Sequence, residues 1–88
     1  MAKYQILYWK HIPAQLRAFE ADGKRLSRQL PSRFQEQIDR VAMAEGLAGT
    51  DEYLKYWHWS EKLERPGSAE EVAIAVVRDL ENAFPDAG

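Results

Sequence analysis

Residues 53–59 carry four of the ten aromatic side chains and one of the two histidines, and this clustering most constrains how the chain can fold. Aromatic side chains have the largest burial energy, and Trp and Tyr also carry a polar group that suits interfaces. A chain of 88 residues forms one domain with one core. The segment is therefore either the centre of that core or a binding surface.

The composition indicates one globular domain spanning residues 1–88, with 45% hydrophobic and 30% charged residues. The absence of cysteine excludes disulfides and thiolate chemistry. No apolar run reaches the roughly 18 residues of a membrane span, and residues 1–4 lead straight into a strand-like pattern, so we expect no signal peptide. We expect a soluble, cytoplasmic protein without a membrane segment. A domain this small buries only about 60–65% of its surface, so a protein partner or a second copy would stabilise it.

The net charge of −2 is distributed unevenly along the chain. Residues 1–40 hold eight Lys and Arg against four Asp and Glu, whereas residues 41–88 hold four against ten. The two halves can complement each other in the fold. General nucleic-acid binding usually needs a basic surplus, so the overall charge disfavours it.

The first predicted element is a strand over Tyr4–Trp9, with apolar side chains on both faces, as in an inner strand. Ile12-Pro13 is expected to end it, because proline cannot donate a hydrogen bond to a sheet. Residues 15–21 and 24–30 then flank Asp22-Gly23, a strong hairpin signal. A two-residue turn there pairs Glu20 with Arg25, Phe19 with Leu26, and Arg17 with Arg28. The last pair opposes two positive charges and needs an anion or a carboxylate nearby.

Two helices are predicted from capping signals and apolar spacing. Ser32 is the expected N-cap of the first, with Gln35 in capping-box position, and Gly46 is expected to end it. Its buried side is predicted to comprise Phe34, Ile38, Val41 and Ala42. Ser68 and Glu71 form a capping box for the second. Its buried side is predicted to comprise Val72, Ala75, Val76, Leu80 and Ala83, and to be widened by Ala73 and Val77.

Between the two helices, Thr50 is expected to cap a short helical turn, and a strand is expected from Trp57 until Pro66-Gly67 breaks it. Residues 85–88 are expected to fray. The predicted order is β-β-β-α-β-α. The predicted fold is a small α+β two-layer sandwich, in which two helices pack on one face of a mainly antiparallel sheet. A ferredoxin-like split arrangement is the neighbouring alternative.

Motifs of common enzyme and metal sites are absent from the sequence, including GxGxxG, GxxxxGK[ST], GxSxG and HExxH. The only histidines, His11 and His58, lie 47 positions apart, and surface or network roles are the ordinary explanation for both. We therefore expect a protein that is not an enzyme and has no cofactor and no metal.

The aromatic residues form the first candidate site. Tryptophans in a small domain often simply fill the space between sheet and helices. However, strand alternation places Tyr56 and His58 on the face opposite Trp57 and Trp59, and two helices do not easily cover both faces of one sheet. Exposed aromatic patches mark interfaces. The candidate interaction surface comprises Trp9, Tyr56, Trp57, His58 and Trp59.

The second candidate site is an arginine cluster on the hairpin and just after it, formed by Arg17, Arg25, Arg28 and Arg33. Beside stacking aromatics, such a cluster can bind an anion or the phosphates of a nucleic acid. The more ordinary explanation is an internal salt bridge to Glu61 or Glu64.

Several strings resemble the small bacterial "virulence factor" family. They are Tyr4-x-Ile6-x-Tyr8-Trp9, Leu30-Pro31-x-Arg33-Phe34-Gln35, Thr50-Asp51-x-Tyr53-Leu54 followed by Trp57-x-Trp59, and Glu64-Arg65-Pro66-Gly67-Ser68. The resemblance implies a domain without an established activity or recognised catalytic residues. Some members of that family join the domain to a NifU-like segment and helical repeats, which implies an adaptor or accessory role.

Three hypotheses follow for the function. The first is a cytosolic interaction module that binds a protein partner or itself through its aromatic sheet surface. The second is nucleic-acid or phosphate binding through the arginine cluster. The third is an accessory subunit that contributes His58 to the active site of an enzyme complex.

Overall fold

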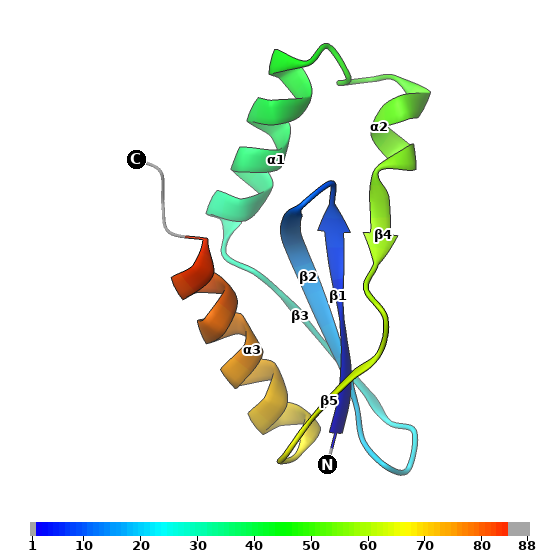
Figure 1. Ribbon diagram of the computed structural model, residues 1–88, viewed down its shortest axis with the longest axis vertical. Coiled ribbons are helices and arrows are strands. Elements are labelled where there is room, and N and C mark those ends of the chain that lie inside the picture. Colours follow the sequence, from blue (N-terminus) through cyan, green and yellow to red (C-terminus); the bar gives the residue numbers. More distant parts are fainter. Residues whose placement is uncertain (1, 85–88) are drawn as a thin grey trace.

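The computed structural model describes residues 2–84 and has a small α+β fold, as predicted (Figure 1). Its elements, in chain order, are β1 (Ala2–Trp9), β2 (Ile12–Phe19), β3 (Arg25–Gln29), α1 (Ser32–Ala44), α2 (Asp51–Lys55), β4 (Trp57–Trp59), β5 (Leu63–Arg65) and α3 (Ala69–Ala83). The expected fraying of residues 85–88 falls outside the described residues.

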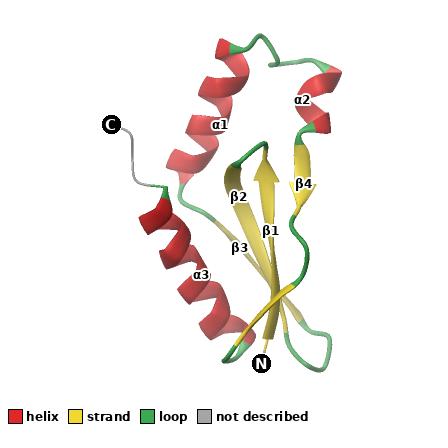
Figure 2. Cartoon of the chain, viewed as in Figure 1, coloured by secondary structure: helices red, strands yellow, loops and turns green. Residues whose placement is uncertain are grey.

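One antiparallel sheet contains all five strands, in the order β3-β2-β1-β4, and β5 pairs with the other half of β1 (Figure 2). β1 is thus an inner strand, as its two apolar faces predicted. The strand expected from Trp57 is divided into β4 and β5. Leu7 pairs with Trp59, and Tyr4 pairs with Leu63. The three residues between Trp59 and Leu63 therefore lie opposite only two residues of β1, those between Tyr4 and Leu7. This extra residue is a β-bulge, which interrupts pairing and re-aims side chains.

The predicted end of the first strand at Ile12-Pro13 is wrong. The chain reverses at Lys10, whose φ is 56°, and Ile12 and Pro13 already belong to β2. Pro13 lies opposite Tyr8, beside a shift in the β1–β2 register between Leu7 and Tyr8. Proline is accepted at such an irregularity because its missing N–H removes no regular ladder bond.

The predicted hairpin register is also wrong by one residue. The Glu20 N–H donates to the Lys24 carbonyl oxygen at 2.8 Å, so the loop contains three residues and ends at Gly23, whose φ is 93°. A three-residue loop with glycine in a left-handed conformation is a common alternative to the two-residue turn. In the observed register Arg17 opposes Ser27, and Arg28 opposes Leu16. The predicted Arg17–Arg28 pair does not form, because a one-residue shift moves a side chain to the other face.

Three of the four predicted helix ends are confirmed. Ser68 and Glu71 form a reciprocal capping box at α3, and the Thr50 hydroxyl accepts from the Tyr53 N–H at α2. At the end of α1, Gly46 has a φ of 70° and the Leu47 N–H donates to the Ala42 carbonyl oxygen. The Ser32 cap is wrong: Ser32 is the first helical residue and follows Pro31, whose ring leaves that cap without a side-chain hydrogen bond.

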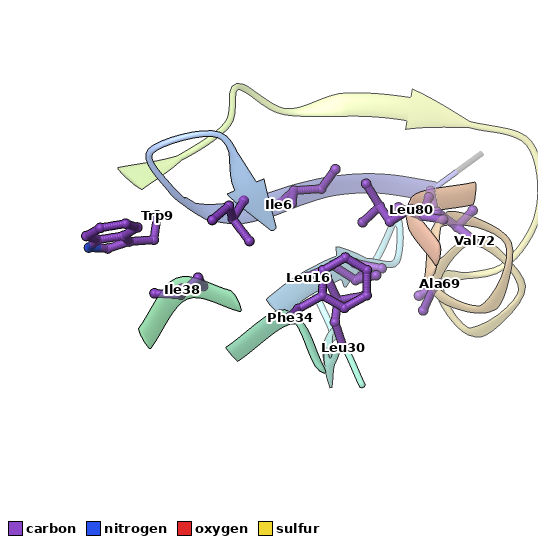
Figure 3. Close-up of a cluster of buried hydrophobic side chains, with 14 of the residues drawn as sticks. Ile6, Trp9, Leu16, Leu30, Phe34, Ile38, Ala69, Val72 and Leu80 are labelled. Atoms are coloured by element: carbon purple, nitrogen blue, oxygen red, sulfur yellow. The ribbon is translucent and has the colours of Figure 1, made fainter. Parts of the chain in front are cut away.

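The core lies between the helices and one face of the sheet (Figure 3). α3 packs across β1, β2 and β3, while α1 packs against β2. Ala73, predicted to widen the buried side of α3, is buried, whereas Ala83, predicted on the same side, is exposed. The buried hydrophobic residues are Ala2, Ile6, Trp9, Ile12, Leu16, Ala18, Leu30, Phe34, Ile38, Ala42, Leu47, Ala69, Val72, Ala73, Val76 and Leu80.

Candidate functional site

The face of the sheet that turns away from α3 carries a group of side chains outside the hydrophobic core. Along β1 and β2 the buried residues Ile6, Leu16 and Ala18 alternate with Gln5 and Arg17, which are half-buried. Opposite residues of an antiparallel pair share a face, so the register assigns each side chain to one side. We call this side the aromatic–cation face; its main members are Lys3, Gln5, Arg17, Phe19, Trp59 and Lys62.

Rings and cations alternate across this face. The Arg17 guanidinium carbon lies 3.8 Å from the Trp59 ring centroid and 5.7 Å from that of Phe19. The Lys62 ammonium lies 4.8 Å from the centroid of the same Phe19 ring. Contacts of this kind contribute about 0.5–1 kcal/mol each at exposed sites. Trp59, Arg17, Phe19 and Lys62 therefore form one continuous row.

Arg17 is held in place by more than stacking. Its Nε donates to the Gln5 side-chain oxygen at 3.0 Å, and the Gln5 amide nitrogen donates to the Ser60 carbonyl oxygen at 2.9 Å. Ser60 is in turn paired with β1, since its N–H donates to the Ile6 carbonyl oxygen at 2.8 Å. A side chain fixed by such a chain of hydrogen bonds loses little conformational freedom when a partner binds.

The face has a positive charge although the protein has a net charge of −2. Lys3 and Arg25 add to Arg17 and Lys62, since Arg25 is directly opposite Phe19 in the register. The one acidic residue in a strand on this side, Glu64, lies 4.0 Å from the Lys3 ammonium. The face therefore suits a partner with acidic groups.

The arginines predicted to form one cluster are in fact separated. Arg17 and Arg25 share the aromatic–cation face, whereas Arg28 lies opposite the buried Leu16 at the α3 side of the sheet. Arg33 lies at the start of α1 and donates to the carbonyl oxygens of Glu81 and Phe84. Arg28 and Arg33 are therefore removed from the proposed anion site.

The five residues of the predicted interaction surface are also divided. Trp9 is fully buried, and its indole N–H donates to the Tyr53 carbonyl oxygen at 2.9 Å, so its assignment to the surface is wrong. The physical reason is that Trp9 is the last residue of β1 and packs against Tyr53 of α2, with 5.5 Å between ring centroids, in the same buried cluster as Ile38 of α1. Trp57 is half-buried against Tyr53, with 6.1 Å between ring centroids. Trp59 remains the central ring of the surface.

Tyr56 and His58 lie away from the Trp59 row. His58 is exposed, stacks on Tyr8 with 5.8 Å between ring centroids, and places Nδ1 3.1 Å from the Tyr56 carbonyl oxygen. Tyr56 contacts the Lys10 ammonium, which lies 4.6 Å from its ring centroid. Burial, together with the neighbouring Tyr4, raises the pKa of Tyr8.

Two hollows border the aromatic–cation face. One of about 470 Å³ opens beside Phe19 and Lys62, and one of about 390 Å³ opens beside Leu7 and Trp57 at the start of α1. Sequence reasoning missed Phe19, Gln5 and Lys62 as parts of the surface. Phe19 was placed opposite Leu26 by the shifted register, and nothing in the sequence marked the bulge that precedes Leu63.

Within residues 2–84, no cluster of three or more His, Asp or Glu side chains is arranged to hold a metal ion. In the same residues, no helix has the length and hydropathy needed to cross a membrane.

A family model described as "virulence factor" matches residues 7–88 of the chain. This match covers the last three residues of β1 and all later elements. No curated protein and no solved structure shows a significant match.

Proposed function

We propose that this chain, which belongs to the virulence factor family, is an interaction module that binds a protein partner through its aromatic–cation face. The observation that supports the proposal is the row formed by Trp59, Arg17 and Phe19 outside the hydrophobic core. Trp and Arg are the residues most enriched among interface hot spots, and aromatic residues are enriched at interfaces generally.

The chemistry of this face indicates the kind of partner. The rings of Trp59 and Phe19 supply apolar area, while Arg17, Lys3 and Lys62 surround them with positive charge. A complementary surface would present apolar side chains bordered by Asp or Glu. A second copy of this chain would have to bring acidic residues from elsewhere on its surface.

Nucleic acid is the second candidate, since Arg17 and Arg25 lie beside aromatic rings on one face. Bases stack on exposed rings in single-strand binding proteins. Here the Arg17 guanidinium already covers the Trp59 ring at 3.8 Å, and Arg28 and Arg33 lie elsewhere. These contacts favour a protein partner over nucleic acid.

The test begins with capture of partners from extracts of the native cell on immobilised protein, followed by titration of each purified candidate. Trp59→Ala and Arg17→Glu are expected to weaken binding at least tenfold. Arg40→Glu is the matched control, since Arg40 is an exposed residue of α1. Circular dichroism verifies that each variant is folded.

Light scattering across a range of protein concentrations tests whether the partner is a second copy. Equal affinity of wild type and the two face variants for every captured partner, together with a monomer at all concentrations, would contradict the proposal. Salt-dependent binding to an oligonucleotide that Arg17→Glu abolishes would support the second candidate instead.

A further inference from the structure

β3 forms a free edge of the sheet, and its backbone groups on that side are unpaired within the sheet. Two hydrogen bonds at the ends of the β2–β3 ladder fix which pairs are bonded: the Glu20 N–H donates to the Lys24 carbonyl oxygen, and the Leu30 N–H donates to the Ala14 carbonyl oxygen. Hydrogen-bonded and non-hydrogen-bonded pairs alternate along an antiparallel ladder. The backbone groups of Leu26 and Arg28 therefore point toward β2, and those of Arg25, Ser27 and Gln29 point outward. Four of the five β3 residues are exposed.

A groove of about 310 Å³ runs between this edge and α3. α3 lies beside β3, as Figure 2 also shows. The helix contributes Ala73, Ile74 and Val77 to the groove, and Ile74 is 51% exposed. Ile74 and Val77 lie beside the buried stripe of α3 at helical spacing. The apolar surface of α3 thus extends past its contact with the sheet and follows the free edge.

The lining of the groove also includes charged side chains. Arg28 and Arg78 both line it, together with Glu81. Among the described residues, the ion pairs of the structure include neither arginine. The Arg28 guanidinium makes one long contact, 3.5 Å, to the outward carbonyl oxygen of Ser27. The groove therefore combines an apolar part with an excess of positive charge.

We propose that the β3 edge and the α3 groove together bind an extended acidic segment of a partner protein as an additional strand. This site is separate from the aromatic–cation face. An added strand would lie about 4.8 Å from β3, and its alternate side chains would point into the groove. One groove-facing side chain is apolar and contacts Ile74. The next groove-facing side chain, two positions further along the added strand, is acidic and pairs with Arg28 and Arg78.

A second copy fits this edge less well. Pairing two β3 strands would bring Arg25 and Arg28 of one protomer close to those of the other, and like charges oppose such pairing. Charge complementarity therefore selects an acidic segment from another protein.

The test uses a seven-residue peptide with blocked termini, in which the third residue is valine, the fifth is glutamate and the other five are threonine. The peptide is titrated into the ¹⁵N-labelled full-length chain. Saturable shifts are expected along β3 and α3. The amides of Arg25, Ser27 and Gln29 should exchange with solvent at least tenfold more slowly in the complex. The amides of Leu26 and Arg28 should change little, since they are already bonded to β2.

Three controls separate strand addition from general attraction. A peptide with lysine in place of glutamate, and one N-methylated at alternate backbone nitrogens, should each bind at least tenfold more weakly. Arg78→Glu should weaken binding to the same extent, because Arg78 is exposed and its substitution leaves the core intact. Trp59→Ala should leave peptide affinity unchanged. This result would distinguish binding at the β3 edge from binding at the aromatic–cation face.

Absence of saturable shifts at millimolar peptide would overturn the proposal. Unchanged exchange at the three outward amides would do the same, since the peptide would then bind without adding a strand. Protection of those amides that rises with protein concentration, without peptide, would assign the edge to a second copy.

Discussion

Trp9 and Trp59 should respond to truncation in opposite ways, although the sequence placed both on one candidate surface. Trp9 is fully buried, and its indole N–H is bonded to the Tyr53 carbonyl oxygen. Trp9→Ala should therefore lower the free energy of unfolding by about 3–5 kcal/mol. A domain of 88 residues is typically stable by roughly 4–13 kcal/mol, so this substitution should remove a large share of the stability of the domain.

Trp9→Phe separates the loss of the hydrogen bond from the loss of the packed ring. It keeps an aromatic ring but removes the indole N–H, which leaves the Tyr53 carbonyl oxygen without this donor. The lost hydrogen bond costs about 1 kcal/mol and the smaller ring about another 1 kcal/mol. Trp59→Ala should cost only about 1–2 kcal/mol, because Trp59 is half-buried and loses mainly the Arg17 contact.

The assay is urea unfolding followed by far-ultraviolet circular dichroism, which does not depend on the tryptophan that is removed. The three variants and wild type are compared at the same protein concentration. A loss below about 1 kcal/mol for Trp9→Ala, or a larger loss for Trp59→Ala than for Trp9→Ala, would refute the assignment of Trp9 to the core and Trp59 to the surface.

Three further predictions concern helix ends and one titrating group. Ser68→Ala should lower the free energy of unfolding by about 1 kcal/mol, whereas Ser32→Ala should change it by less than about 0.5 kcal/mol, because only Ser68 caps its helix; urea unfolding of both variants checks this, and equal losses would contradict it. Arg33→Met removes two hydrogen bonds to carbonyl oxygens at the end of α3 and should cost about 1.5–3 kcal/mol, with faster amide exchange in the last turn of α3; unchanged exchange there would count against it. Burial raises the pKa of Tyr8 above its usual 10.0, so the folded state holds the phenolic proton more tightly than the unfolded state. The associated stability is complete below pH 10 and is lost as the pH rises through the raised pKa, so Tyr8→Phe should reduce the decline in stability measured by urea unfolding above pH 10; an identical decline in both proteins would argue against this.

The predictions from sequence succeeded where the physical signal is local. Gly46 ends α1 because a left-handed residue there closes the last turn, and Ser68 begins α3 because its hydroxyl and Glu71 satisfy two free N–H groups. β1 was recognised as an inner strand since both of its faces carry apolar side chains. Each inference depends on residues within a few positions of one another.

Two of the errors arose where a single residue of register decides the outcome. Asp22-Gly23 predicted a turn, but two-residue and three-residue loops both accept this pair, and the choice determines the face on which Arg28 lies. The same holds for the residue inserted before Leu63, since a bulge has no signature in this sequence. The sequence could name aromatic residues and arginines as candidates, but it could not show which of them lie together.

The sequence by itself determined the helices, the inner strand β1, three of the four predicted helix ends, the absence of cysteine chemistry and the resemblance to the virulence factor family that the family match bears out. Only the tertiary structure decided which rings are buried. Trp9 and Trp59 look equivalent along the chain, yet the hairpin end places Trp9 in the core, whereas Trp59 meets Arg17 from a strand more than forty residues away. Burial and stacking depend on contacts between distant segments, so they follow from sheet register and helix packing rather than from local pattern.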